Sequence, residues 1–153
     1  MSNTLFDKIV SGEISSYKVW EDDKHLAFLT PFPNTPGLTV LIPKTNPGDY
    51  IFNIDNTSYL ELMEATKKLA KILEKALSVE RVAVVVEGTG VAYVHVKLYP
   101  LFGELANQTN VWSKEKVFHE EYQGFISTEE GPEMNKKRLI NIQNKIKMAS
   151  NKK

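Results

Sequence analysis

The chain contains no cysteine, which excludes disulfide bonds, thiol nucleophiles and cysteine-ligated zinc. Neither charge is in excess, because 19 lysines and arginines balance 19 aspartates and glutamates. The net charge therefore gives no reason to expect a protein that binds nucleic acids or membrane surfaces. No apolar run reaches the length of a membrane span, and the first residues lack a basic segment followed by a long apolar stretch. We expect a cytoplasmic protein without a membrane partner.

The alternation of apolar residues predicts several short strands in the first hundred residues. The expected strands are residues 17–21, 25–30, 38–44, 81–88 and 92–100. The run at 81–88 is almost unbroken in apolar residues, so we expect it at the centre of a sheet. A short turn, Gly88-Thr89-Gly90, then predicts an antiparallel hairpin with the strand that follows.

Helical spacing of apolar residues occurs twice in the same region. A first helix around Leu5, Phe6 and Ile9 is expected to stop at Gly12. A longer helix follows a capping box of Ser58 and Glu61. Its apolar stripe consists of Leu62, Ala65, Leu69, Ile72, Leu73 and Ala76. The predicted fold class is α+β, a mostly antiparallel sheet that carries one long amphipathic helix.

After Pro100 these patterns weaken. Residues 123–131 predict a brief strand, and a helix is expected to open near Pro132 with Leu139, Ile142 and Ile146 on one side. We therefore divide the chain into a core domain of residues 1–103 and a C-terminal helical extension of residues 104–153, packed on or beside the same domain. The basic residues of the extension fit a solvated helix face, and a polyanion patch is the alternative. They are Lys136, Lys137, Arg138, Lys145 and Lys147.

One histidine stands out in the strand "AYVHVKLYP". There, Val94, Val96 and Leu98 share one face, and the other face carries Tyr93, His95, Lys97 and Tyr99. A single histidine on a polar strand face is usually a surface residue. The alternative is a nucleophile with helpers two residues to each side.

Several stretches, in the same linear order, resemble the histidine-triad (HIT) superfamily of nucleotide hydrolases and transferases. They are "FDKIVSGEISSYKVWEDDKHLAFL", "PNTPGLTVLIPK", the long helix and "VHVKLYP", covering roughly residues 4–101. The resemblance implies a five-stranded antiparallel sheet and usually a homodimer whose two sheets join. It also implies a nucleotide or other phosphorylated small molecule bound beside the triad strand.

The family's signature strand reads His-x-His-x-His, and its middle histidine, here His95, attacks the α-phosphorus. The first and third triad positions are Tyr93 and Lys97. A fourth family histidine falls on Asn46, and the ribose-binding aspartate falls on Thr30. These departures from the family pattern bear on activity more than on fold.

Further family positions complete the expected site. Phe6 and Phe28 match the apolar base pocket, with plain core packing as the alternative. Many members carry a zinc-type Cys-x-x-Cys where this chain has Thr4 and Asp7, so we expect no metal and no cofactor. The phosphate loop is shortened to residues 88–90.

Lys97 is expected to assist His95, because residues two apart on one strand face lie about 7 Å apart. Its ammonium disfavours a protonated imidazole and neutralises charge on a phosphate oxygen. Tyr93 and Asn46 can donate hydrogen bonds to phosphate without supplying charge, although Tyr93 fits core packing equally well.

The sequence thus predicts a nucleotide-phosphate hydrolase or nucleotidyl transferase that forms a nucleotidyl-His95 intermediate. Its substrate would be a nucleoside phosphoramidate or a dinucleoside polyphosphate-like molecule. The alternative is a non-catalytic HIT-fold protein that binds a nucleotide or phosphate ligand, or a dimeric interaction module. We do not expect nucleic-acid binding. His25 is expected to be exposed, and His119 lacks the spacing of a metal site.

Overall fold

The computed structural model describes residues 4–103, 116–124, 132–138 and 140–143. The chain divides into two compact units, Met1–Gln108 and Thr109–Lys153. The expected packing of residues 104–153 against the core domain stays a prediction. Within the described residues, no helix is both long enough and apolar enough to cross a membrane.

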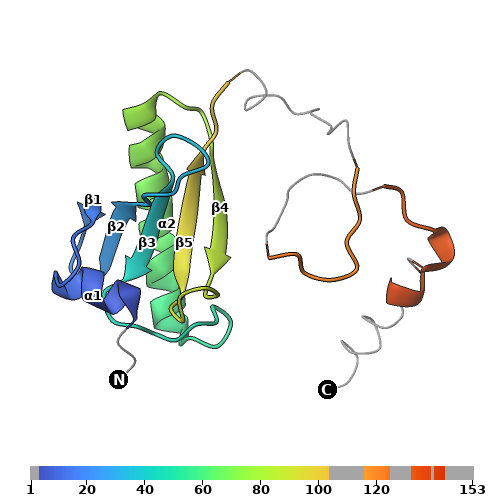
Figure 1. Cartoon of the computed structure of the whole chain (residues 1–153), viewed down its shortest axis with the longest axis horizontal. Helices are drawn as coiled ribbons and strands as arrows, with labels where there is room; N and C mark the ends of the chain where they lie inside the picture. Colours follow the sequence, from blue (N-terminus) through green and yellow to red (C-terminus); the bar gives the residue numbers. More distant parts are fainter. Residues whose placement is uncertain (1–3, 104–115, 125–131, 139, 144–153) are drawn as a thin grey trace. The chain divides into compact units, whose positions relative to one another are not determined.

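The first unit is built on a five-stranded antiparallel sheet, as predicted (Figure 1). The strands are β1 (Tyr17–Glu21), β2 (His25–Leu29), β3 (Thr39–Pro43), β4 (Val82–Glu87) and β5 (His95–Pro100). Their order across the sheet is β1-β2-β3-β5-β4. The α+β prediction is confirmed.

The prediction that residues 81–88 form a central strand is wrong, because β4 lies at the edge of the sheet beside β5 alone. Val82 and Val86 pack against the core under the sheet, whereas Val84 is exposed. The apolar run therefore reflects burial of some β4 side chains, and it does not mean that β4 is paired with a strand on each side.

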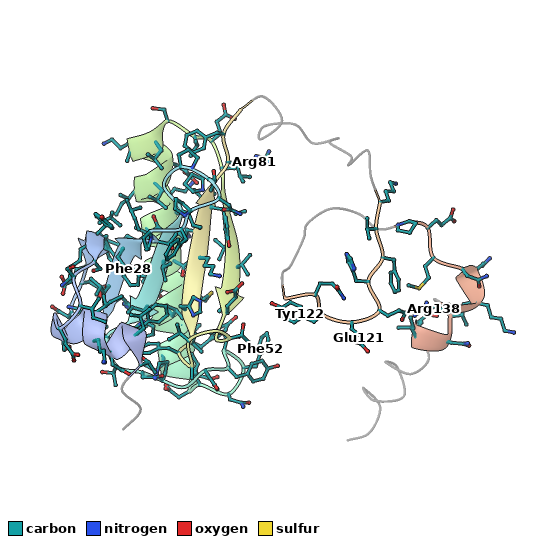
Figure 2. All side chains as sticks on the ribbon, in the orientation of Figure 1. Phe28, Phe52, Arg81, Glu121, Tyr122 and Arg138 are labelled. Atoms are coloured by element: carbon teal, nitrogen blue, oxygen red, sulfur yellow. The ribbon has the colours of Figure 1, made fainter. Side chains whose placement is uncertain are left out.

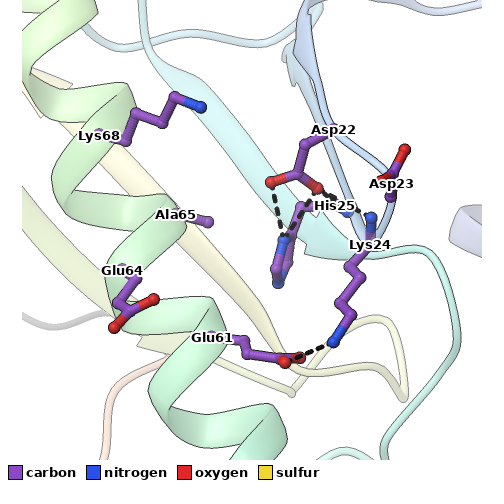
Figure 3. Close-up of a pocket in the computed structure, with 8 residues that line it drawn as sticks. All are labelled: Asp22, Asp23, Lys24, His25, Glu61, Glu64, Ala65 and Lys68. Carbon is purple, nitrogen blue, oxygen red and sulfur yellow. Dashed lines mark hydrogen bonds and ion pairs between the residues drawn. The ribbon is translucent and has the colours of Figure 1, made fainter.

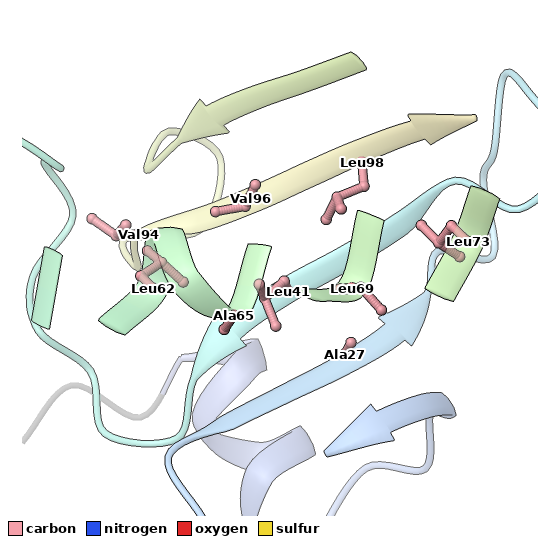
Figure 4. Close-up of a cluster of buried hydrophobic side chains, with 9 residues drawn as sticks. All are labelled: Ala27, Leu41, Leu62, Ala65, Leu69, Leu73, Val94, Val96 and Leu98. Carbon is pink, nitrogen blue, oxygen red and sulfur yellow. The ribbon is translucent and has the colours of Figure 1, made fainter. Parts of the chain in front are cut away.

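The long helix α2 (Asn56–Leu77) covers one face of the sheet (Figure 1). Its buried residues join strand residues in one core cluster (Figure 4). The cluster consists of Ala27, Leu41, Leu62, Ala65, Leu69, Leu73, Val94, Val96 and Leu98. Two residues of the predicted stripe, Ile72 and Ala76, are exposed instead, and Thr66 is buried with its hydroxyl donating to the Leu62 carbonyl at 2.7 Å.

The start of α2 differs from the predicted capping box. The N-cap is Asp55, whose side chain accepts from the Ser58 backbone N–H at 2.9 Å. Ser58 lies inside the helix and its hydroxyl donates to the same carboxylate, while Glu61 pairs with Lys24. Aspartate and serine both cap helices well, so the sequence pattern alone selected Ser58 where the N-cap is Asp55.

The short helix α1 (Leu5–Ser11) packs on the opposite face of the sheet. It ends as predicted at Gly12, which has the left-handed conformation with φ of 80°. Phe6 and Ile9 of α1 enter a second core cluster with strand residues that include Phe28, labelled in Figure 2. This second face carries the candidate site.

The described part of the C-terminal unit contains helical residues 136–138 and 140–143, shortly after Pro132, near which a helix was expected to open. Arg138 forms a two-pronged ion pair with Glu120, at 2.8 and 2.6 Å, and lies over the Phe118 ring. Arg138 is thus engaged within the unit, while Lys136 and Lys137 are exposed. Leu139, Lys145, Ile146, Lys147 and most of the expected strand at 123–131 lie outside the described residues.

Candidate functional site

A cavity of about 420 Å³ lies on the sheet face that carries α1. Its walls come from α1, from the segment that leads into β1, from the four strands β1, β2, β3 and β5, from the residues that follow β2 and from the loop between β4 and β5. Five of the seven predicted site residues line it together: Phe6, Phe28, Thr30, His95 and Lys97. Their roles toward a ligand stay predictions.

His95 opens β5, and its imidazole is 4% exposed. Its Nδ1 lies 2.8 Å from the backbone carbonyl of Tyr93. Because a carbonyl only accepts, Nδ1 carries the proton, and Nε2 of the neutral ring keeps its lone pair. The edge-to-face contact with Phe6, at 5.2 Å between ring centroids, holds the ring in this position.

Burial is the main reason that the pKa of His95 lies below its ordinary value of 6.5. The Tyr93 carbonyl opposes this by stabilising the ring N–H, and the ammonium of Lys97 lowers the pKa further. Lys97 therefore acts in the expected direction, but as a smaller cause than desolvation. The result is an imidazole that is neutral at neutral pH, as a nucleophile must be.

The sequence analysis missed Glu87, which sits opposite His95 in the β4–β5 register. Its Oε2 lies 2.5 Å from Nζ of Lys97 and 3.6 Å from Nε2 of His95. A three-residue turn at 88–90 would have paired Glu87 with Val91. Because the connection runs through residues 88–94, the carboxylate instead faces the histidine.

The structure corrects the expected placement of Tyr93 and Asn46, neither of which lines the cavity. Tyr93 is fully buried, its hydroxyl donates to the Pro43 carbonyl at 2.5 Å, and burial raises the pKa of this phenol well above its usual range. Asn46 donates to the Ala92 carbonyl and accepts from the Gly48 N–H, so it connects two loops. The packing alternative for Tyr93 is the one observed.

Phe6 and Phe28 lie both in the core and at the cavity, and their role toward a base stays a prediction. They belong to the core cluster of this face, with ring centroids 5.7 Å apart, and they also wall the cavity. Thr30 also lines the cavity, and its hydroxyl accepts from the N–H of the exposed Phe32. Because Phe6 contacts both Phe28 and His95, the aromatic end of the cavity, at Phe6 and Phe28, directly adjoins its polar end, at His95 and Lys97.

The loop before β5 is fixed by a close backbone approach. The N–H of Val94 donates to the Gly48 carbonyl at 2.7 Å. A Cβ on Gly88 would lie 1.6 Å from the carbonyl oxygen of Asp49, so only glycine fits there. These contacts set where the chain enters β5 and hence where His95 sits.

A second hollow, of about 360 Å³, contains His25 (Figure 3). The expectation that His25 is exposed is wrong, since the residue is 5% exposed. Its Nδ1 lies 3.1 Å from Oδ1 of Asp22, and Asp22 also accepts the backbone N–H groups of His25 and Lys24. His25 thus anchors the β1–β2 turn, although its position after a run of charged residues predicted solvent contact.

The residues at the zinc-type positions do not suit a metal. Thr4 and Asp7 form a reciprocal capping box for α1, in which the Asp7 carboxylate accepts the Thr4 N–H at 2.8 Å. Both side chains are thereby occupied, and neither is a thiolate or an imidazole. The described residues hold no cluster of histidine, aspartate and glutamate side chains that a metal ion would need.

Comparison with known proteins agrees with this architecture. The chain is 37% identical over 75 residues to an uncharacterized HIT-like protein of Borreliella burgdorferi, covering 49% of this chain and 53% of that one. It is 38% identical over 74 residues to the adenylylsulfatase HINT1 of Arabidopsis thaliana, covering 48% and 50%. The chain thus spans about half the length of both curated relatives.

Solved structures extend the likeness beyond these segments. The crystal structure of SMU.412c from Streptococcus mutans superposes with a TM-score of 0.68 and 27% identity, covering 97% of this chain and 86% of that one. The family model of the HIT domain matches residues 11–100. The chain belongs to the HIT family.

Proposed function

We propose that this protein is a nucleotide-phosphate hydrolase or nucleotidyl transferase that works through a nucleotidyl-His95 intermediate. The observation that carries the proposal is the state of His95: a buried, neutral imidazole in the wall of a cavity, with Nδ1 held by the Tyr93 carbonyl. Similarity to an adenylylsulfatase supports the same chemistry. The substrate would be a nucleoside phosphoramidate or a dinucleoside polyphosphate-like molecule.

In the first step, Nε2 of His95 attacks the α-phosphorus, an Nε2–P bond forms, and the bond to the leaving group breaks. The leaving group departs with the bonding pair and takes up a proton from the solvent, which regains one when water attacks in the second step. The ring becomes cationic, and the Tyr93 carbonyl stabilises that charge through Nδ1–H. Water or another acceptor then displaces His95, which returns to its neutral form.

Lys97 lies on the same strand face and supplies the positive charge of the polar end of the cavity. An ammonium held beside the reacting phosphate stabilises the charge that develops on its oxygens. The aromatic end, with Phe6 and Phe28, suits a planar base.

A non-catalytic protein that binds a nucleotide or phosphate ligand is the second candidate. Two observations favour it. Tyr93 and Asn46 do not line the cavity, because they form hydrogen bonds elsewhere. Lys97 already forms an ion pair with Glu87. In that case a ligand would raise the melting temperature without being consumed.

The experiment that separates the two is the substitution His95→Ala, assayed on a panel of adenosine phosphoramidates and dinucleoside polyphosphates. We expect turnover to fall by at least about 1,000-fold, as loss of a covalent nucleophile does. Mass spectrometry should detect an adenylyl group on His95 of the parent protein. His119→Ala, which removes a histidine from the other unit, is the matched control.

Equal turnover by His95→Ala and the parent protein would refute the nucleophile assignment. Ligand-dependent stabilisation without turnover or adenylylation would instead establish the binding protein.

We also propose that the protein forms a homodimer by pairing of β4 edges. Both edge strands of the sheet carry an exposed valine, Val19 on β1 and Val84 on β4. The register of β1 is broken between Lys18 and Trp20, and such irregularity protects a sheet edge from pairing. The regular, valine-rich β4 offers the better edge.

A further inference from the structure

Glu87 is not among the residues that line the cavity, but its carboxylate contacts the two polar residues that do, Lys97 at 2.5 Å and Nε2 of His95 at 3.6 Å. We propose that Glu87 determines specificity by charge, so that the cavity accepts a phosphate group with one negative charge and discriminates against groups with two or more. This inference rests on the proposed function, since it names the ligand class of the same site.

The charges around the cavity support this assignment. Of the described residues that line it, Lys97 is the one with a formal charge at neutral pH, because His95 is neutral. The Glu87 carboxylate already lies 2.5 Å from Nζ of Lys97 and balances its charge. The pair therefore has no net charge, and it does not compensate the hydration that a ligand loses with each negative charge it brings into the cavity.

The position of the carboxylate makes the discrimination specific to the reacting phosphate. For attack, phosphorus must approach Nε2 of His95 to about 3–3.5 Å. Because Oε2 of Glu87 lies 3.6 Å from the same nitrogen, phosphorus at that position is at most about 7 Å from the carboxylate. Two like charges at such separations repel strongly when they are partly shielded from water.

The other polar groups of the cavity wall cannot offset this repulsion with charge. The hydroxyl groups of the wall can hydrogen-bond a phosphate oxygen but supply no positive charge. They belong to Ser15, Ser16, Tyr17, Thr30 and Thr89. The polar end therefore suits a phosphodiester or phosphoramidate, in which one oxygen is anionic. A terminal phosphate or a polyphosphate loses more hydration on binding, so of the two proposed substrate classes this inference favours the phosphoramidate.

The test compares three probes that share adenosine and differ in charge: adenosine 5′-methylphosphate, AMP and ADP. At pH 8 their phosphates carry about one, two and three negative charges, because the second pKa of a phosphate monoester is near 6. Calorimetry would give the Kd of each probe for the full-length parent protein and for Glu87→Gln. This readout does not depend on turnover.

We expect the parent protein to bind the methyl ester at least about tenfold more tightly than ADP. In Glu87→Gln, which keeps the size of the side chain, the order should reverse or the difference should vanish. Glu87→Asp keeps the charge and should keep the parent's preference. Glu80→Gln is the matched control, since it removes the same charge from an exposed residue before the opposite end of β4.

Thermal unfolding of each variant shows whether the fold is intact. Folded Glu87→Gln with the parent's order of affinities would overturn the inference and leave the proposed function standing. The same holds if the parent binds all three probes equally well. Failure of the parent to bind any of them would count against both.

Discussion

At the scale of the residue, one hydrogen bond decides which nitrogen of His95 is available. The Tyr93 carbonyl fixes the proton on Nδ1, and Nε2 is left to face Glu87 and the polar end of the cavity. The residue at the first triad position therefore contributes through its backbone, while its side chain supports the core. A backbone contact of this kind survives the replacement of a histidine by tyrosine.

The lowered pKa of His95 has a consequence for stability. In the unfolded chain the imidazole takes up a proton near its ordinary pKa of 6.5, whereas in the native state burial disfavours the charged form. Protonation therefore favours unfolding as the pH falls below about 6.5. We expect this group to add up to about 1.4 kcal/mol per pH unit to the slope of the free energy of unfolding.

Urea unfolding between pH 8 and pH 5 measures this slope. His95→Asn removes the titrating group and should flatten the curve over that range, leaving the contribution of the other titrating residues. Parallel curves for the parent and the variant would mean that His95 is not buried in its neutral form.

Among single residues, the sequence predicted correctly those whose place at the cavity follows from strand alternation or from a family position. His95, Lys97, Thr30, Phe28 and Phe6 line one cavity because the strand alternation and the family positions place them on one face. The placement of Tyr93 and Asn46 depended on tertiary contacts, with the Pro43 carbonyl and with neighbouring loops, that local patterns do not contain. The position of Glu87 opposite His95 depended on the length of the loop between β4 and β5, which the sequence predicted to be shorter.

At the scale of the element, the start of α2 is set by Asp55. Its carboxylate accepts both the N–H and the hydroxyl of Ser58. We expect Asp55→Ala to lower the melting temperature by about 3 °C, the usual effect of losing an N-cap. Glu61→Gln should lower it by less than about 1 °C, because Glu61 takes part only in a surface ion pair with Lys24.

Differential scanning calorimetry of the two variants distinguishes these roles. A larger loss for Glu61→Gln than for Asp55→Ala would restore the capping box of Ser58 and Glu61 and contradict the observed helix start.

The loop before β5 depends on Gly88. A Cβ at this position would overlap the Asp49 carbonyl at 1.6 Å, so Gly88→Ala must displace one of two loops. We expect the free energy of unfolding to fall by about 3 kcal/mol, in the upper part of the range for overpacking. His95 would shift with the loop, so ligand affinity should fall as well.

The control for Gly88→Ala is Gly90→Asn. Gly90 has a φ of 80° and open space around its Cα, a conformation that asparagine tolerates. Chemical denaturation of both variants measures the difference. Equal stability of the two would show that the loops are free to separate without cost.

Helices and strands were predictable from the sequence where neighbouring residues determine them, and less so where contacts between distant segments do. The hairpin of β1 and β2, the end of α1 at Gly12 and the amphipathic stripe of α2 follow from turn residues and periodicity. The place of β4 in the sheet does not, since an edge strand and a central strand can share one apolar run. Pairing order is decided by long-range contacts, here by β5 inserting between β3 and β4.

At the scale of the whole molecule, the family order of elements across roughly residues 4–101 sufficed to predict the fold, because many weak signals agree in sequence, and the HIT family model matches residues 11–100. The oligomeric state depends on surfaces, and the two edges of the sheet differ in the features that permit pairing. Exposed, regular and apolar strands pair readily, whereas a break in register opposes pairing. This contrast makes the dimer testable with a matched pair of variants.

Val84 on β4 and Val19 on β1 are exposed to similar extents, 42% and 44%. A lysine on a strand edge opposes pairing with another chain, because pairing would bring its charge close to the same lysine of the second copy and remove it from water. We expect Val84→Lys to convert a dimer into a monomer in sedimentation experiments, with the melting temperature then independent of protein concentration up to tens of micromolar. Val19→Lys should leave the dimer intact. Dissociation by Val19→Lys alone would assign the interface to β1, and a monomeric parent protein would refute the dimer altogether.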